Sequence, residues 1–175
     1  SAEVSARIME LPFREGEAVR KGDVIIRLDA VTFQARLESA RARRDAQSYQ
    51  LQSEQSRLQG PLASLENARE NLRRQDALFK TGDISRQDLD NARNSVNNLL
   101  AQVEAGKLAI SVLESNLAAA EAEIEQALEA LEKTVMRSPM DGVITILQAE
   151  VGELVMVGTM NNPGTVIMSI ADLSK

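Results

Sequence analysis

Hydrophobic residues in the middle of the chain recur every seven positions and form two ladders. The first ladder is apolar at all but one position and consists of Leu37, Arg44, Leu51, Leu58, Leu65, Leu72 and Phe79. The second ladder is apolar throughout and consists of Leu89, Val96, Val103, Ile110, Leu117, Ile124 and Leu131. A sustained seven-residue repeat predicts α-helices that pack along a coiled-coil seam.

A short segment between the ladders carries the signals of a chain reversal. Lys80-Thr81-Gly82-Asp83-Ile84 contains one glycine, and Ser85 followed by Asp88 resembles a capping box that opens a second helix. A reversal at this point pairs the ladders antiparallel in matched register. We therefore predict a helical hairpin over residues 31–136, with helices at about 31–80 and 85–135 and a tip at 81–84. Gly60-Pro61 predicts a kink or a short break near 57–61.

The two ends of the chain have β character and repeat each other. Gly16-Glu17-Ala18-Val19 is followed by Gly22, and Gly152-Glu153-Leu154-Val155 is followed at the same spacing by Gly158. Strand candidates rich in β-branched residues accompany both copies, as in Val24–Leu28. Each end is too short to bury a core alone, so we expect the two ends to form one small β domain.

The composition and net charge of the chain exclude several classes of protein function. The chain contains no His and no Cys, which excludes a thiolate nucleophile, an imidazole base and a Cys/His zinc site. The net charge of -6 argues against non-specific nucleic-acid binding. Residues 31–80 carry nine basic and six acidic side chains, whereas 85–136 carry four basic and nine acidic ones, so the two predicted helices attract each other. We expect a non-enzymatic protein.

Two motifs in the β segments resemble the lipoyl/biotinyl-carrier fold. Glu15-Gly16-Glu17-Ala18-Val19-Arg20-Lys21-Gly22-Asp23 resembles its EGxxVxxGD turn, and Ser138-Pro139-Met140-Asp141-Gly142-Val143-Ile144 resembles its SPxxGxI strand entry. With a hairpin inserted between them, the whole chain resembles the periplasmic adaptor (membrane-fusion, HlyD-like) proteins of bacterial tripartite efflux and secretion systems.

The resemblance implies an α+β fold, in which a long antiparallel two-helix coiled-coil hairpin is inserted into a split lipoyl/biotinyl-like β-sandwich. The implied domains are a first lipoyl-like half at 1–30, the hairpin at 31–136 and a second half at 137–175. Carrier proteins attach their cofactor to a lysine in a tight turn, but no lysine follows Asp29 here. We therefore expect no lipoate and no biotin.

The predicted tip matches a family pattern for docking. Adaptors that dock onto TolC-like outer-membrane channels share the spacing R-x3-L-x6-S, which Arg74, Leu78 and Ser85 satisfy. The resemblance implies that these residues bind the partner. The alternative is that Arg74 is solvated, Leu78 packs inside the hairpin and Ser85 is only a helix cap. We expect no catalytic residue, because the chain has no His and no Cys. We expect no metal site, because the six methionines, which lie in or beside the β segments, form no compact cluster and suit core packing.

The implied function is that of an adaptor that links an inner-membrane transporter to a TolC-like channel. The resemblance implies a homo-oligomer, usually a hexamer, in the periplasm, attached to the inner membrane by an anchor outside this sequence. Residues 161–167, together with the seven positions of each hairpin ladder, resemble MacA-like adaptors of ABC-type exporters more than adaptors of proton-driven pumps. The alternatives are a coiled-coil scaffold with a carrier-like β head and, if an attachment lysine existed, a carrier domain. The sequence does not identify the cargo.

Overall fold

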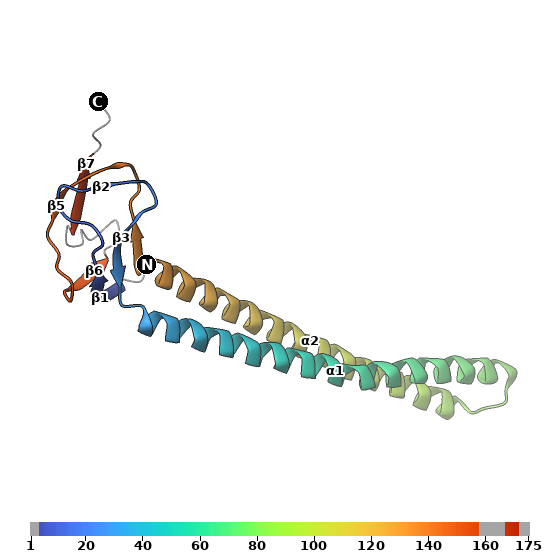
Figure 1. Cartoon of the computed structure of the whole chain (residues 1–175). Helices are drawn as coiled ribbons and strands as arrows, with labels where there is room; N and C mark the ends of the chain where they lie inside the picture. The colour runs from blue at the N-terminus through green and yellow to red at the C-terminus, as the bar shows by residue number, and fades with distance from the viewer. Residues whose placement is uncertain (1–3, 158–166, 172–175) are drawn as a thin grey trace. The chain divides into compact units, whose positions relative to one another are not determined.

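The computed structural model describes residues 4–157 and 167–171, so most of the 161–167 segment lies outside the described residues. The chain divides into two compact units. One unit comprises Ser1–Arg41 and Ala122–Lys175 and contains the strands, and the other comprises Ala42–Glu121 and is helical. The α+β class and the helical hairpin expected from the sequence are confirmed (Figure 1).

Strands from both ends of the chain are mixed within two sheets. The bounds are β1 Val4–Glu10, β2 Ala18–Val19, β3 Val24–Leu28, β4 Val135–Arg137, β5 Gly142–Leu147, β6 Leu154–Val157 and β7 Met168–Ala171. The order is β4-β3-β1-β6 in one sheet and β2-β5-β7 in the other. Each sheet therefore needs strands from both ends, which explains why neither end is a domain by itself. The two- and three-residue strands β2 and β4 are too short to leave a sequence pattern.

The repeated segments form equivalent turns, and each turn donates a hydrogen bond to a strand of the other half. The Gly16 amide donates to the Ile144 carbonyl at 2.8 Å, and the Gly152 amide donates to the Ile8 carbonyl at 2.8 Å. Both glycines have a positive φ, 88° and 94°, which side chains disfavour. Inside each turn a glutamate carboxylate accepts a hydrogen bond from the backbone amide three residues earlier. Glu17 accepts from Arg14 in the first copy, and Glu153 accepts from Glu150 in the second. The part of the repeat that the structure describes, as far as Val155 in the second copy, is therefore a structural repeat, and Gly158 lies outside the described residues.

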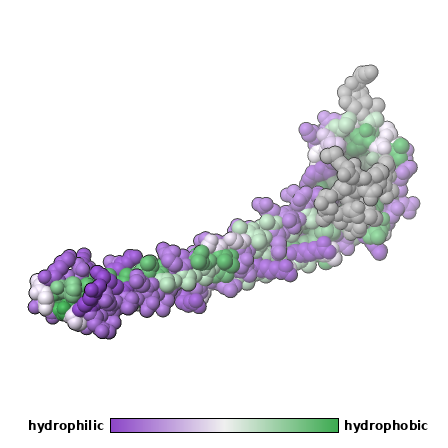
Figure 2. Space-filling model, turned by 180° about the vertical axis from the view of Figure 1, so that it is seen from behind, coloured by the Kyte–Doolittle hydropathy of each residue, from purple (hydrophilic) through white to green (hydrophobic). Residues whose placement is uncertain are grey.

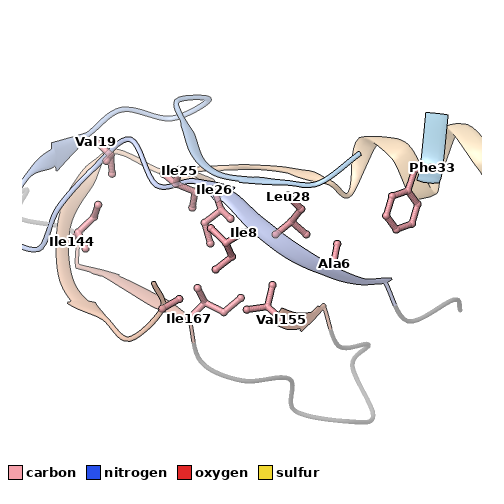
Figure 3. Close-up of a cluster of buried hydrophobic side chains, with 11 residues drawn as sticks. Ala6, Ile8, Val19, Ile25, Ile26, Leu28, Phe33, Ile144, Val155 and Ile167 are labelled. Carbon is pink, nitrogen blue, oxygen red and sulfur yellow. The ribbon is translucent and has the colours of Figure 1, made fainter. Parts of the chain in front are cut away.

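The core of the β unit is drawn from both halves of the chain. Its fully buried members include Ile8 and Leu28 from the first half and Ile144 from the second, and Phe33 at the start of the first helix covers one end (Figure 3). Burial of apolar side chains is the main source of folding free energy. Pairing of the two halves in one core is therefore what stabilises both.

Helix α1 spans Val31–Thr81 and α2 spans Arg86–Glu132. The Asp29 carboxylate accepts the Val31 amide at 3.0 Å and so stabilises the start of α1. Helix α2 ends three residues earlier than the sequence suggested. The reason is that the carbonyl of Thr134 accepts the Leu28 amide at 2.8 Å, which takes the following residues into β4.

Within the helical unit the two ladders pack against each other. The buried cluster consists of Leu58, Leu65 and Val103, and the side chains packed against it are Leu62, Val96, Leu99 and Ile110. The members come from both helices, so the two ladders share one buried seam. The tightest approach is made by Leu58, which lies directly against Gly106 of α2.

Of the kink or short break predicted near 57–61, the break is wrong, because α1 is continuous through Pro61. A proline inside a helix removes one backbone hydrogen bond and costs about 3 kcal/mol. The buried seam on both sides offsets this cost. Opposite Pro61, small residues of α2, including Ala105 and Gly106, border the same hollow of about 320 Å³ and leave room for the ring.

Candidate partner-binding site at the hairpin tip

The end of α1 is fixed by hydrogen bonds within the turn. The Asp83 amide donates to the Leu78 carbonyl at 2.9 Å, and the Gly82 amide donates to the Phe79 carbonyl at 3.1 Å. Gly82 has a φ of 84°, so these bonds form a Schellman motif. The Thr81 hydroxyl also donates to the Leu78 carbonyl, at 2.9 Å. The turn therefore has one defined backbone path.

Helix α2 begins with a capping box formed by Ser85 and Asp88, which confirms the prediction. The Asp88 amide donates to the Ser85 hydroxyl oxygen at 3.2 Å, and the Ser85 amide donates to the Asp88 carboxylate at 3.2 Å. The Ser85 hydroxyl also donates to that carboxylate at 2.6 Å. Because the hydroxyl donates and accepts within the cap, the first role of Ser85 is to shape the turn.

Of the three predicted docking residues, Arg74 and Leu78 have side chains that are accessible to a partner. They lie four residues apart and therefore share one face of α1. Leu78 is 41% exposed, which contradicts the alternative that it packs inside the hairpin. Arg74 is exposed and makes no ion pair within the part of the chain that the structure describes, whereas its neighbour Arg73 is bound to Glu70 at 2.6 Å.

One carboxylate near the tip has a shifted pKa. Lys80 lies 2.7 Å from Asp76, and its hydrogen bond and positive charge lower the pKa of Asp76 below the usual value. Lys80 is thereby engaged within α1. Together with the Arg73–Glu70 pair, this leaves Arg74 as an accessible cation on this part of α1.

Sequence reasoning missed a polar hollow beside the tip. A space of about 380 Å³ lies between the two helices, and its lining residues are Asn71, Gln75, Asp88, Asn91, Ala92 and Ser95. Figure 2 shows a mostly hydrophilic surface over the helices, broken by apolar patches. The available signal was the recurrence of asparagine, a poor helix former, at 91, 94, 97 and 98. That signal does not reveal which of these residues face α1.

The described residues contain neither a cluster of metal ligands nor a membrane-spanning helix. Across 4–157 and 167–171, no group of three or more acidic, His or Cys side chains is placed to bind a metal ion. Neither helix of that part is apolar enough over a sufficient length to cross a bilayer.

Comparison with known proteins gives one family and several relatives. Residues 1–167 match the family described as "RND MFP, barrel-sandwich hybrid domain". Multidrug resistance protein MdtN from Shigella flexneri is 32% identical, over 86% of this chain and 51% of that protein. Multidrug resistance protein MdtE from Escherichia coli strain K12 is 30% identical, over 94% of this chain and 35% of that protein.

A solved structure supports the same assignment. The crystal structure of MacA from Actinobacillus actinomycetemcomitans matches with a TM-score of 0.59 and 28% identity, over 99% of this chain and 48% of that one. The chain thus spans 51% or less of the length of each of these three relatives.

Proposed function

Because the chain belongs to the barrel-sandwich hybrid family of RND-type membrane fusion proteins, we propose that it is the lipoyl-like and hairpin part of a periplasmic adaptor. The adaptor joins an inner-membrane transporter to a TolC-like outer-membrane channel for export of drugs, other small molecules or peptides. Residues 1–30 and 137–175 form the lipoyl-like domain and 31–136 the hairpin. The full-length protein is attached to the inner membrane. The names of MdtN and MdtE as multidrug resistance proteins support this assignment.

The observation that carries the docking role is that Arg74, in the last part of α1, is exposed and makes no ion pair with any residue that the structure describes. Its guanidinium presents five donors in a fixed arrangement that suits carbonyl or carboxylate groups of a partner. Leu78, one helical turn further on, supplies an apolar contact. Ser85 holds the turn through its cap, so its contribution depends on the position of the backbone as much as on its own side chain.

A homo-oligomer, with six copies as the proposed number, is supported by the exposed surface of α2. Leu108 is 69% exposed and Val112 is 60% exposed, one helical turn apart on the same face. Large apolar side chains of this kind gain free energy when a neighbouring molecule covers them. The opposite net charges of the two helices favour contact between α1 of one copy and α2 of the next.

The transporter class is part of the proposal. The likeness of residues 161–167 to MacA-like adaptors and the match to MacA over 99% of the chain support an ABC-type exporter. The family description supports an RND-type pump instead. Purification of the full-length protein in mild detergent, with identification of the bound transporter, decides between them. An ATP-binding subunit in the complex is the expected result, and an RND pump would overturn the ABC assignment.

The docking role is tested by substitution at the tip of the full-length protein. We expect Arg74→Asp to weaken binding to the purified channel at least tenfold, as for a central interface arginine. Arg73→Asp is the matched control, since it makes the same charge change at the adjacent position and is expected to leave binding unchanged. Equal binding by wild type and Arg74→Asp would remove Arg74 from the site.

Ser85 needs a test that separates capping from contact. Ser85→Asn retains a good cap, whereas Ser85→Arg removes the cap and adds a bulky cation at the turn. We expect Ser85→Asn to bind the channel as wild type does and Ser85→Arg to abolish binding while the helical content stays the same. If the wild-type adaptor binds neither a channel nor a transporter, the scaffold alternative replaces the adaptor.

A further inference from the structure

A hollow of about 320 Å³ interrupts the packing between the two helices partway along the helical unit. Its lining residues are Glu54, Arg57, Leu58 and Pro61 of α1 and Gln102, Ala105, Gly106 and Ala109 of α2. On the α2 side, all but Gln102 are alanine or glycine, whose side chains are too short to fill the space. The two helices are therefore incompletely packed at the same level.

The backbone of α1 is weakened at this hollow. Pro61 has no N–H, so it cannot donate the helical hydrogen bond to the carbonyl of Arg57. Gly60 comes directly before it, and glycine is the poorest helix former after proline. Sharp bends in helices occur mostly at proline or at small residues such as glycine. Helix α1 is thus continuous here but resists bending less than it does on either side.

The backbone of α2 is weakened at the same level by its one glycine. Gly106 borders the hollow opposite Pro61. The Leu58 side chain lies directly over Gly106, because a Cβ added there would be 2.7 Å from the Leu58 Cδ1 atom. Leu58 is only 9% exposed, so it holds the two helices in contact beside the hollow. A single side chain against bare backbone is a contact about which the helices can tilt.

The charged residues at this level do not connect the two helices within the part of the chain that the structure describes. Arg57 is paired with Glu54 at 3.0 Å within α1, and Lys107 is paired with Glu104 at 2.9 Å within α2. Each pair joins residues three positions apart on one helix. A tilt of one helix against the other therefore breaks neither ion pair.

The packing between the helices differs on the two sides of the hollow. On the side towards the tip, Leu65 is 4% exposed and Val103 is 1% exposed, and both belong to the buried cluster. On the other side, every residue of 41–57 and of 104–119 is at least partly exposed. The hollow thus lies where a tightly packed part of the hairpin meets a loosely packed one.

We propose that the hairpin bends at this hollow, with Gly60-Pro61 and Gly106 as the two hinge points and Leu58 as the pivot between them. The hollow provides the space into which side chains move as the helices tilt. The bend changes the direction of the part of the hairpin beyond Pro61 relative to the part before it. The hinge is a property of the helical unit and goes beyond the proposed function. In an adaptor, it lets the tip meet a partner at more than one angle.

Hydrogen exchange of the full-length protein, followed by mass spectrometry, tests whether the two hinge points open together. Pro61→Ala restores the missing hydrogen bond of α1, and we expect it to slow exchange about tenfold in 57–65 and also in 103–110 of α2. The matched control is Asn67→Ala, which favours the same helix at an exposed position outside the lining. We expect the control to leave exchange in 103–110 unchanged. Unchanged exchange there in Pro61→Ala, or an equal slowing in the control, overturns the coupled hinge.

A second measurement follows the bend itself. The chain contains no cysteine, so spin labels attach only at introduced ones. Ala42→Cys and Ala77→Cys are exposed and lie roughly 50 Å apart along α1, on opposite sides of Pro61. We expect the distribution of this distance to narrow when Pro61→Ala is added, whereas the Ala63→Cys and Ala77→Cys pair, beyond the hinge, keeps its width. Equal widths with and without Pro61→Ala overturn the bend. Neither measurement involves a partner, so failure of the hinge leaves the proposed function standing.

Discussion

Ile8 and Ile144 hold equivalent places at opposite ends of the chain, and the carbonyl of each accepts a hydrogen bond from a glycine of the other half. Gly152 donates to Ile8 and Gly16 donates to Ile144, both at 2.8 Å. Both isoleucines are fully buried. Each half therefore supplies the strand on which the turn of the other half closes, and the hairpin is inserted between two segments that fold only together.

This exchange predicts that Gly16→Ala and Gly152→Ala destabilise the β unit to a similar extent. Both positions have a positive φ, where a side chain costs about 1–2 kcal/mol, although no neighbouring atom obstructs either one. Urea unfolding of each variant gives the measurement. Gly60→Ala is the control, because Gly60 lies inside α1 with open space around it. That change is expected to stabilise by about 1 kcal/mol. Loss of stability in only one turn variant would refute the equivalence.

Leu58 and Gly106 are predicted to be energetically coupled. A Cβ added to Gly106 would lie 2.7 Å from the Cδ1 atom of Leu58, so Gly106→Val overfills the seam and is expected to cost about 1–3 kcal/mol. Leu58→Ala removes the obstructing atoms, so the double variant is expected to be more stable than the sum of the single effects implies. A double-mutant cycle by thermal or urea unfolding measures the coupling.

The control cycle pairs Leu58→Ala with Gly60→Val. Nothing lies within 4 Å of a Cβ placed on Gly60, so the two changes are expected to be additive. Additive behaviour in the Leu58 and Gly106 cycle as well would show that the two helices do not pack there as described.

The Asp76–Lys80 pair predicts a local effect of pH. Lys80 lowers the pKa of Asp76, so the pair stabilises the folded state above the unfolded pKa of the carboxyl and is lost as pH falls through the folded pKa. Lys80→Met is expected to raise the pKa of Asp76 towards 3.8. Carboxyl titration by NMR measures the change. Glu129, whose pKa is lowered by Lys133 in the same way, is the internal control and is expected to keep its value in this variant.

The features that the sequence predicted are those encoded in short or regular spacings. The seven-residue ladders define a seam because burial follows helix periodicity, and the cluster of Leu58, Leu65 and Val103 occupies that seam. The turn was readable because Gly82 and the Ser85–Asp88 spacing act on residues within one helical turn. Arg74 and Leu78 could be identified as site candidates only through the family pattern. The sequence did not predict that their side chains are exposed.

Other features depend on atoms that the sequence does not place side by side. Pro61 signals a break by itself, but packing on both sides of it keeps α1 continuous. Ser85 matched both a cap and a docking residue, and the hydrogen bonds with Asp88 show that its hydroxyl is used in the cap. The short strand β4 exists only because β3 pairs with it.

The sequence by itself determined the helical hairpin, its turn, and the repeat that joins the two β segments. Periodicity and local hydrogen bonding act along the chain, so a linear pattern carries them. The tertiary structure decided which strands exchange hydrogen bonds and which asparagines of α2 line the space opposite Asn71. Those outcomes depend on how two segments distant in sequence face each other, because a hydrogen bond or a hollow is defined by atoms on both sides.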